Sequence, residues 1–201
     1  MAAIGLMGGT FDPIHYGHLI LAQQAWQKLE LDKVVFVTSP NPPNKVEQVL
    51  TDARDRHEMV RLAVRENDRF ECSTIEIERG GVSYTIDTIR QLKRQLEVGS
   101  HIHLLLGADE AKMLMTWRDP KGIAELADIV VANRPGHPVA EALENLSADL
   151  AERIIRLQIP GVDISSSDIR ARVARGESIT YLVPPEVEKY IVREGLYRER
   201  K

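Results

Sequence analysis

The stretch that decides the fold of this chain reads Met7-Gly8-Gly9-Thr10-Phe11-Asp12-Pro13-Ile14-His15-Tyr16-Gly17-His18. It follows an apolar, strand-like run over residues 2–6 and precedes an amphipathic, helix-like run over residues 19–29. Glycines let a backbone come close to an anion, and a helix N-terminus presents unpaired N–H groups to it. Two histidines three residues apart lie on one face of a helix, within reach of the same phosphate. The stretch therefore predicts a phosphate site in an α/β protein.

Length and composition are those of an ordinary globular protein, with 201 residues, 43% of them hydrophobic and 28% charged. The formal net charge of −4 argues against a nucleic-acid partner, because proteins that bind polynucleotides usually carry a basic face. The single cysteine, Cys72, excludes an intrachain disulfide and a cysteine zinc cluster, and we interpret it as a small hydrophobe near a strand. No apolar run is long enough to cross a bilayer, so we expect no membrane partner and a cytoplasmic location.

Apolar runs alternate with helix-period segments, which favours repeated strand–helix units and a mainly parallel sheet. Most strand candidates are short and apolar, as expected for strands covered on both faces. The third candidate alternates apolar with charged residues, which suggests a position at an edge of the sheet. The candidate strands are Ala2–Met7, Lys33–Thr38, Phe70–Ile77, His101–Leu106, Asp128–Ala132 and the more weakly marked Ile154–Gln158.

The helical segments between the strands carry one apolar stripe each. We expect a Rossmann-like, doubly wound α/β fold with helices on both faces of the sheet. It would form a single domain over residues 1–201, with a small C-terminal helical part from about residue 165. Ligands of such sheets bind outside the carboxyl ends of the strands, where the Pro-rich loop Ser39–Val49 is expected. The candidate helices are Leu19–Leu29, Asp52–Arg65, Tyr84–Leu96, Ala111–Trp117, Val139–Glu152, Ser167–Arg175 and Pro185–Glu194.

Three familiar uses of glycine- or histidine-rich turns do not fit the first motif. A dinucleotide turn needs G-x-G-x-x-G and an acidic residue after the second strand, but Gly5, Gly8 and Gly9 are spaced differently and no acid follows. The Gly-Lys-Ser/Thr of a Walker A loop is absent, and H-x-G-H is not the H-E-x-x-H of a zinc protease. Imidazoles that hydrogen-bond phosphate oxygens fit the spacing, and the plainer alternative is a pair of capping or surface histidines.

A second candidate phosphate site is the run Ile164-Ser165-Ser166-Ser167-Asp168-Ile169-Arg170. Three hydroxyls precede a helix-period segment, so one of them can serve as the N-cap. The sharper interpretation is a second phosphate cradle made of serine hydroxyls, helix N–H groups and the Arg170 guanidinium.

At these two motifs the chain resembles the nucleotidyltransferase superfamily that shares an H-x-G-H core with class I aminoacyl-tRNA synthetases. More narrowly, it resembles the bacterial-type nicotinate-nucleotide adenylyltransferases, in the same order over essentially the whole chain. The resemblance implies transfer of the adenylyl group of ATP to nicotinate mononucleotide in NAD biosynthesis, with deamido-NAD and pyrophosphate as products. The supporting segments are Arg56-His57-Glu58-Met59, Ser83-Tyr84-Thr85-Ile86-Asp87-Thr88, Gly107-Ala108-Asp109 with Trp117 downstream, Asn133-Arg134-Pro135-Gly136 and Gly195-Leu196-Tyr197-Arg198.

The resemblance implies an ATP site built from both motifs. The glycine turn and the two histidines would face the ATP phosphates, and the serines with Arg170 would close on them from the other side. Asp109 would hold the adenosine ribose, for which a helix N-cap is the alternative. Arg134 would lie near ATP, for which a surface arginine before a turn is the alternative. The residues implied by the two motifs are Gly8, Gly9, Thr10, His15, His18, Ser165, Ser166, Ser167 and Arg170.

The resemblance also implies where the acceptor binds. Its pyridine ring would stack on Trp117, for which core packing is the alternative. Backbone N–H groups around Thr85, at a helix start that favours an anion, would hold its carboxylate. Lys45 matches the cationic position of the family's Pro-rich loop, whereas Asn44 stands where the family usually carries a histidine.

The implied chemistry needs no general base, because a phosphate monoester with a second pKa of about 6 is already mostly dianionic at neutral pH. Charge stabilisation would come from His15, His18, Lys45 and Arg170, and Mg²⁺ would be held mainly by the ATP phosphates, with no protein metal ligands. Two rivals are an adenylyltransferase for nicotinamide mononucleotide or phosphopantetheine, and a non-catalytic nucleotide-binding module. A third, a class I synthetase fragment, lacks the K-M-S-K-S loop. The oligomeric state is left open, a homo-oligomer included.

Overall fold

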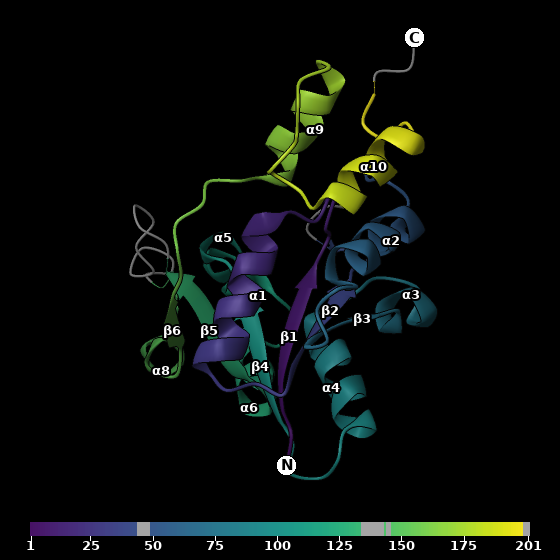
Figure 1. Cartoon of the computed structure of the whole chain (residues 1–201). Coiled ribbons are helices and arrows are strands. Elements are labelled where there is room, and N and C mark those ends of the chain that lie inside the picture. The colour runs from purple at the N-terminus through teal and green to yellow at the C-terminus, as the bar shows by residue number, and fades with distance from the viewer. Residues whose placement is uncertain (44–48, 134–142, 144–145, 199–201) are drawn as a thin grey trace.

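A computed structural model of the chain describes residues 1–43, 49–133, 143 and 146–198. Six parallel strands form one sheet in the order β3-β2-β1-β4-β5-β6 (Figure 1). The chain therefore winds outward from β1 to one edge and then crosses to β4, which confirms the doubly wound Rossmann-like fold. The strands are β1 (Ala3–Gly9), β2 (Lys33–Thr38), β3 (Phe70–Ser73), β4 (His101–Leu106), β5 (Asp128–Asn133) and β6 (Ile155–Gln158).

Helices cover both faces of this sheet. One buried cluster joins the sheet to α1 (Tyr16–Lys28), α2 (Ala53–Val64), α9 (Ser166–Ala174) and α10 (Pro185–Arg193). A second cluster, on the other face, joins it to α3, α4, α5, α6 and α8. The bounds of these last helices are Ile75–Arg79, Thr85–Gln95, Ala108–Lys112, Pro120–Leu126 and Ala148–Glu152, and a short 3₁₀ turn covers Leu114–Thr116.

The alternation of apolar side chains along the strands explains the two clusters. In β2, Val34 and Phe36 point into the cluster of α1 and α2, whereas Val35 and Val37 point into the cluster of α4. All four side chains are buried, because successive side chains of a strand point to opposite faces and both faces are covered. The nearly continuous apolar run that marked this strand in the sequence is thus the signature of a central strand.

Several predicted bounds were wrong. The candidate strand Phe70–Ile77 lies at the edge as expected, but β3 ends at Ser73 and Ile75 begins helix α3. The candidate helix Ala111–Trp117 is in fact α5 followed by the 3₁₀ turn, and α6 was not predicted at all. Its start is marked by the side chain of Asp119, which accepts a hydrogen bond from the backbone N–H of Gly122, and by Pro120 in the first turn.

Two other predictions have mixed outcomes. The first half of the candidate helix Val139–Glu152 lies largely outside the described residues, and Ala148–Glu152 is helical. Cys72 lies in β3 and packs against the α1–α2 cluster, and burial raises the pKa of its thiol, as fits a small hydrophobe. None of the described helices combines the length and the apolar character that a membrane crossing requires.

The carboxyl ends of the strands lie at one end of the molecule, together with α2, α9 and α10 (Figure 1). The strand order reverses between β1 and β4, and this switch point is where open α/β sheets bind ligands. The glycine turn follows β1 directly, so the topology alone places the first motif at the expected site.

Candidate active site

Two cavities open at the carboxyl end of β1. The first, of about 570 Å³, extends toward the start of α4 and is called the β1–α4 cavity; Thr85, Trp117 and Arg118 help to line it. The second, of about 510 Å³, extends toward the start of α9 and is called the β1–α9 cavity; His18 and Arg170 help to line it. Each is large enough for a nucleotide-sized ligand.

The two cavities share one wall. Four residues line both cavities: Gly8, Gly9, Thr10 and Glu110. The glycine turn therefore lies at the boundary between the two cavities. Two ligands that fill the cavities would meet at this turn. A built Cβ on Gly9 would come within 2.8 Å of the Phe11 ring, which explains a glycine at that position.

The two histidines of the first motif stack on each other at the start of α1. Their ring centroids are 3.8 Å apart with an interplanar angle of 29°. The backbone N–H of His15 donates to Nδ1 of His18 at 3.2 Å, which places the hydrogen of a neutral His18 ring on Nε2. The edge-to-face contact of Phe11 with His18, at 5.1 Å, supports this ring further. His18 is thus held in an orientation and a tautomer that give it an N–H donor.

Gly17 has a local reason to lack a side chain. A Cβ at this position would lie 3.0 Å from the His15 ring, closer than nearly all real Cβ contacts. The glycine between the histidines therefore leaves room for the buried imidazole of His15, which is 7% exposed. This adds a packing reason to the expectation that the glycine lets a phosphate approach.

The second motif lies directly against the first. The Ser166 hydroxyl donates to the carbonyl of Pro13 at 2.8 Å, and the Arg170 guanidinium donates to the carbonyl of Asp12 at 2.7 Å. Ser165 is the N-cap of α9, because its hydroxyl oxygen accepts from the backbone N–H of Asp168. Residues more than 150 positions apart in the sequence are therefore joined at one site.

The predicted residues of both motifs line the β1–α9 cavity, together with Asp109. Asp109 is exposed in the first turn of α5, and the N-cap of that helix is Gly107, so the capping alternative for Asp109 was wrong. Lys45 and Arg134 lie outside the described residues. The predicted residues on this cavity are Gly8, Gly9, Thr10, His15, His18, Asp109, Ser165, Ser166, Ser167 and Arg170.

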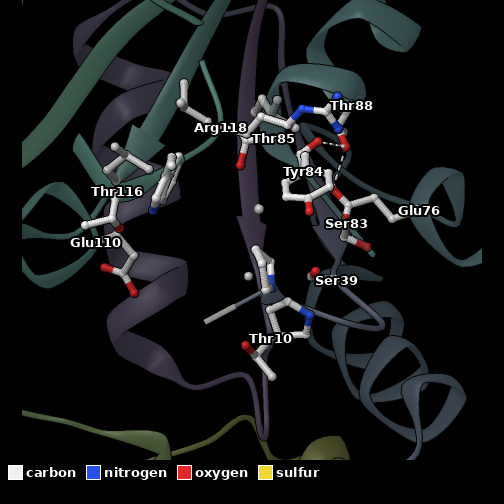
Figure 2. A pocket seen from close by; sticks show the side chains of 18 residues that line it. Thr10, Ser39, Glu76, Ser83, Tyr84, Thr85, Thr88, Glu110, Thr116 and Arg118 are labelled. Carbon is white, nitrogen blue, oxygen red and sulfur yellow. Dashed lines mark hydrogen bonds between the residues drawn. The ribbon is translucent and has the colours of Figure 1, made fainter. Parts of the chain in front are cut away.

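The predicted acceptor residues line the other cavity. Thr85 is the first residue of α4, and Trp117 is half-buried, lining the cavity while it packs against the α4 cluster. Figure 2 shows Glu110 and Thr116 on one side of this cavity, Ser83 and Tyr84 on the other. Trp117 therefore packs against the core, as the alternative interpretation holds, and it also lines the cavity in which the acceptor is expected.

Sequence reasoning missed Arg118, whose guanidinium lies 4.8 Å from the centre of the Tyr84 ring and 3.7 Å from the Asp87 carboxylate. Among the described residues that line the β1–α4 cavity, Arg118 is the one cation. Trp117 was predicted because an aromatic side chain can stack on the pyridine ring. The adjacent Arg118 carries no comparable signal in the sequence, because an arginine before a helix is common on protein surfaces.

A buried polar network at the far wall of this cavity was also missed. Glu76 is 5% exposed, and its Oε1 accepts from the Thr88 hydroxyl at 2.5 Å and lies 3.8 Å from the Arg79 guanidinium (Figure 2 shows the bond to Thr88). Arg79 also donates to Thr88. The network ties α3 to α4 and so fixes the start of α4, where Thr85 lies. Glu76 falls within the predicted strand Phe70–Ile77, where this contact with Thr88 could not be foreseen.

The fold and the paired motifs define a nucleotidyltransferase. The model of the cytidylyltransferase-like family matches residues 6–172, a range that contains both motifs. Among solved structures, the Plasmodium falciparum nicotinic acid mononucleotide adenylyltransferase complexed with NaAD superimposes with a TM-score of 0.77. The match covers 98% of each chain at 17% sequence identity, and it supports the fold.

Curated relatives narrow the class. The probable nicotinate-nucleotide adenylyltransferase of Desulfitobacterium hafniense (strain Y51) is 43% identical over 97% of this chain and 95% of its own length. The probable nicotinate-nucleotide adenylyltransferase of Thermus thermophilus is 43% identical over 97% of this chain and 99% of its own. The chain therefore belongs to the nicotinate-nucleotide adenylyltransferases within the cytidylyltransferase-like family.

Proposed function

We propose that this enzyme transfers the adenylyl group of ATP to nicotinate mononucleotide, with deamido-NAD and pyrophosphate as products. The observation that carries the proposal is the shared wall: two nucleotide-sized cavities meet at Gly8, Gly9, Thr10 and Glu110. ATP in the β1–α9 cavity and the acceptor in the β1–α4 cavity would bring their phosphates together there. The names of the relatives support this acceptor, and the solved relatives from Plasmodium falciparum hold NaAD or APC.

The ATP-side roles follow from the donors that line the β1–α9 cavity. The N–H at Nε2 of His18 donates to the phosphate oxygen on which charge develops. Arg170 supplies the fixed charge, and because one of its N–H groups is used on the carbonyl of Asp12, its guanidinium has a set position. Asp109 holds the ribose. Lys45 and Arg134 lie outside the described residues. We propose for them the roles that the resemblance implies: Lys45 stabilises charge on the phosphates, and Arg134 lies near ATP.

The reaction is a direct displacement. A phosphate oxygen of the acceptor attacks the α-phosphorus of ATP, and the bond from that phosphorus to the bridging oxygen breaks, so pyrophosphate leaves with the electron pair. No general base is required, because the attacking phosphate is already mostly dianionic at neutral pH. Positioning and charge stabilisation supply the catalysis.

Mg²⁺ fits this site as a companion of the nucleotide. The described residues contain no group of three His, Cys, Asp or Glu side chains that could hold a metal ion. Mg²⁺ commonly takes most of its ligands from substrate phosphates and water. We propose that Mg²⁺ would be held mainly by the ATP phosphates, where its charge would help to neutralise the pyrophosphate, while His18 and Arg170 would remain directed at the phosphate oxygens.

Acceptor binding rests on the other cavity. Trp117 stacks on the pyridine ring, and backbone N–H groups at the start of α4 hold the carboxylate. The Arg118 charge beside Tyr84 strengthens the preference for an acid over an amide.

We also propose that residues 1–201 form one domain, because α10 contacts α2 through Tyr190 and Asp55, whose hydrogen bond is 2.8 Å long. The protein then works on small nucleotides, either alone or as a homo-oligomer.

Trp117→Ala is expected to raise the KM for the acceptor about 10- to 100-fold, the scale of one ring stacked on an aromatic side chain. The KM for ATP stays near the wild-type value, because Trp117 does not line the β1–α9 cavity. Initial-rate kinetics with each substrate varied in turn measure both constants. Trp117→Phe keeps a ring and recovers most of the affinity; equal KM values for Trp117→Ala and wild type would contradict the stacking role.

Arg118→Gln is expected to lower the ratio of kcat/KM for nicotinate mononucleotide to that for nicotinamide mononucleotide by about fivefold, the scale of an exposed charge pair. Arg90→Gln is the matched control, because Arg90 also lies 3.7 Å from Asp87 but does not line the cavity. Purified variants are assayed with both acceptors at fixed ATP and low ionic strength. An unchanged ratio in Arg118→Gln, or an equal drop in Arg90→Gln, would refute the assignment.

A further inference from the structure

A buried carboxylate, that of Asp12, holds the turn that follows β1, and Asp12 also lines the β1–α9 cavity. Asp12, 3% exposed, accepts a hydrogen bond from the Tyr197 hydroxyl on Oδ1 at 2.7 Å. Its Oδ2 accepts from the backbone N–H of Thr51 at 3.2 Å. Its own carbonyl is the group that receives Arg170. Asp12 therefore connects the C-terminal turn and the start of α2 to the ATP-side guanidinium.

A buried guanidinium lies beside this carboxylate. Arg56, 1% exposed, donates to the carbonyls of Thr10 at 2.6 Å, Ser39 at 2.7 Å and Pro40 at 3.0 Å. It thus clamps the ends of β1 and β2 together beneath the wall that the two cavities share. Burial lowers the pKa of Arg56, and the nearby Asp12 charge opposes that shift. The nearby Asp12 carboxylate therefore helps to keep this buried guanidinium charged.

Tyr197 is the C-terminal contribution to this cluster. It follows α10, and burial together with the Asp12 carboxylate raises the pKa of its hydroxyl, so the group stays a hydrogen-bond donor. Without that hydroxyl, Oδ1 of Asp12 would lose its donor in a buried place, which carries a desolvation cost. The side chain would then shift toward another donor, and the turn that carries the Asp12 carbonyl would shift with it.

We propose that Tyr197 is a positioning residue of the reaction: its hydroxyl holds the Asp12 carboxylate, and through Asp12 it sets the placement of the glycine turn and of Arg170. Tyr197 itself does not line either cavity. The proposal rests on the proposed function, because it assigns a role in adenylyl transfer.

The chain offers a matched control for this bond. Tyr190, on α10, donates to the Asp55 carboxylate on α2 at 2.8 Å, a second tyrosine–aspartate bond between the C-terminal segment and the same region. Asp55 does not line either cavity. Tyr190→Phe therefore removes an equivalent hydrogen bond with no direct path to the glycine turn.

The experiment compares Tyr197→Phe with Tyr190→Phe. Both variants are expected to lower Tm by about 2–4 °C, as the loss of one hydrogen bond does in a protein of this size. Only Tyr197→Phe is expected to lower kcat, by about 10-fold or more, because small displacements of reacting groups are costly. The kcat is measured well below both melting temperatures, at saturating ATP and acceptor. A kcat for Tyr197→Phe within twofold of Tyr190→Phe would overturn the proposal.

Asp12→Ala completes a double-mutant cycle, because alanine removes both side-chain oxygens and with them the hydrogen bond from Tyr197. If Tyr197 acts through Asp12, the double variant is no slower than the slower single variant, because both changes break the same connection. Multiplicative losses in kcat would overturn the proposal. Should Tyr197→Phe be unfolded at the assay temperature, it is compared with Tyr190→Phe at a lower temperature at which both are folded, and a kcat within twofold of Tyr190→Phe there would overturn the proposal.

Failure of the proposed role of Tyr197 can be distinguished from failure of the proposed function. Wild-type enzyme is assayed in parallel with nicotinate mononucleotide, nicotinamide mononucleotide and phosphopantetheine, and the variants are compared with whichever acceptor the wild type uses. A different acceptor would overturn the proposed function and leave the ratio of variant to wild-type kcat fully measurable.

Discussion

His18→Ala lowers kcat by at least about 10²-fold, the scale seen when one transition-state hydrogen-bond donor is lost. The expectation rests on the geometry at the start of α1, where His15 fixes the His18 ring by its backbone N–H and leaves the hydrogen on Nε2. The KM for ATP changes less, because the charge that His18 meets grows as pyrophosphate leaves. Steady-state turnover at saturating substrates measures the effect.

Two variants bracket this prediction. His18→Gln keeps an N–H donor on a side chain of similar reach and recovers part of the lost kcat. His101→Ala removes an exposed histidine at the opposite end of the sheet, at the start of β4, and leaves kcat unchanged. Near-normal turnover in purified, folded His18→Ala would refute the role of this residue.

Arg170→Ala is expected to lower kcat by about 10²- to 10³-fold, since it removes a fixed cation from the ATP side of the site. It also leaves the Asp12 carbonyl without its partner at 2.7 Å, so the turn loses one of its restraints. Arg170→Lys restores charge without the planar fork that reaches carbonyl and phosphate together, and it recovers only part of the activity.

Arg172→Ala is the matched control on the same helix. Arg172 pairs with Asp168 at 2.7 Å on the exposed side of α9 and does not line the β1–α9 cavity. Its loss removes one positive charge from the same helix and leaves kcat within about twofold of wild type, because exposed charge pairs contribute little. Equal losses in the two alanine variants would mean that Arg170 acts only through the net charge of the region.

The central strands and the helix start after the glycine turn were predictable because each depends on short-range patterns. Apolar runs such as Lys33–Thr38 report burial on both faces, and a glycine turn followed by H-x-G-H reports a helix start near an anion. The bounds around Phe70–Ile77 were not predictable in this way. Alternating apolar and charged residues over so short a run suit an edge strand and an amphipathic turn of helix equally, and packing of Ile75 against α4 selects the helix.

The contacts that hold the site residues in place could not be predicted from the sequence, because they join residues that only the fold brings together. Asp12 and Tyr197 are 185 positions apart, and nothing local to either residue indicates their hydrogen bond. Arg56 belongs to a segment that supports the resemblance, but nothing in that segment indicates that its guanidinium is buried and donates to four backbone carbonyls. The contact between Arg118 and Tyr84 likewise forms only in the folded chain, where the start of α4 lies beside Arg118.

The most direct test of the central claim is a comparison of acceptors with the purified wild-type enzyme, ATP and Mg²⁺. Pyrophosphate release and the dinucleotide product are followed for nicotinate mononucleotide, nicotinamide mononucleotide and phosphopantetheine in parallel. Two cavities that meet at the glycine turn, with Thr85 and Arg118 at the acceptor end, predict the highest kcat/KM for nicotinate mononucleotide and deamido-NAD as product. Preference for the amide or for phosphopantetheine, or ATP binding without turnover of any acceptor, would contradict the account.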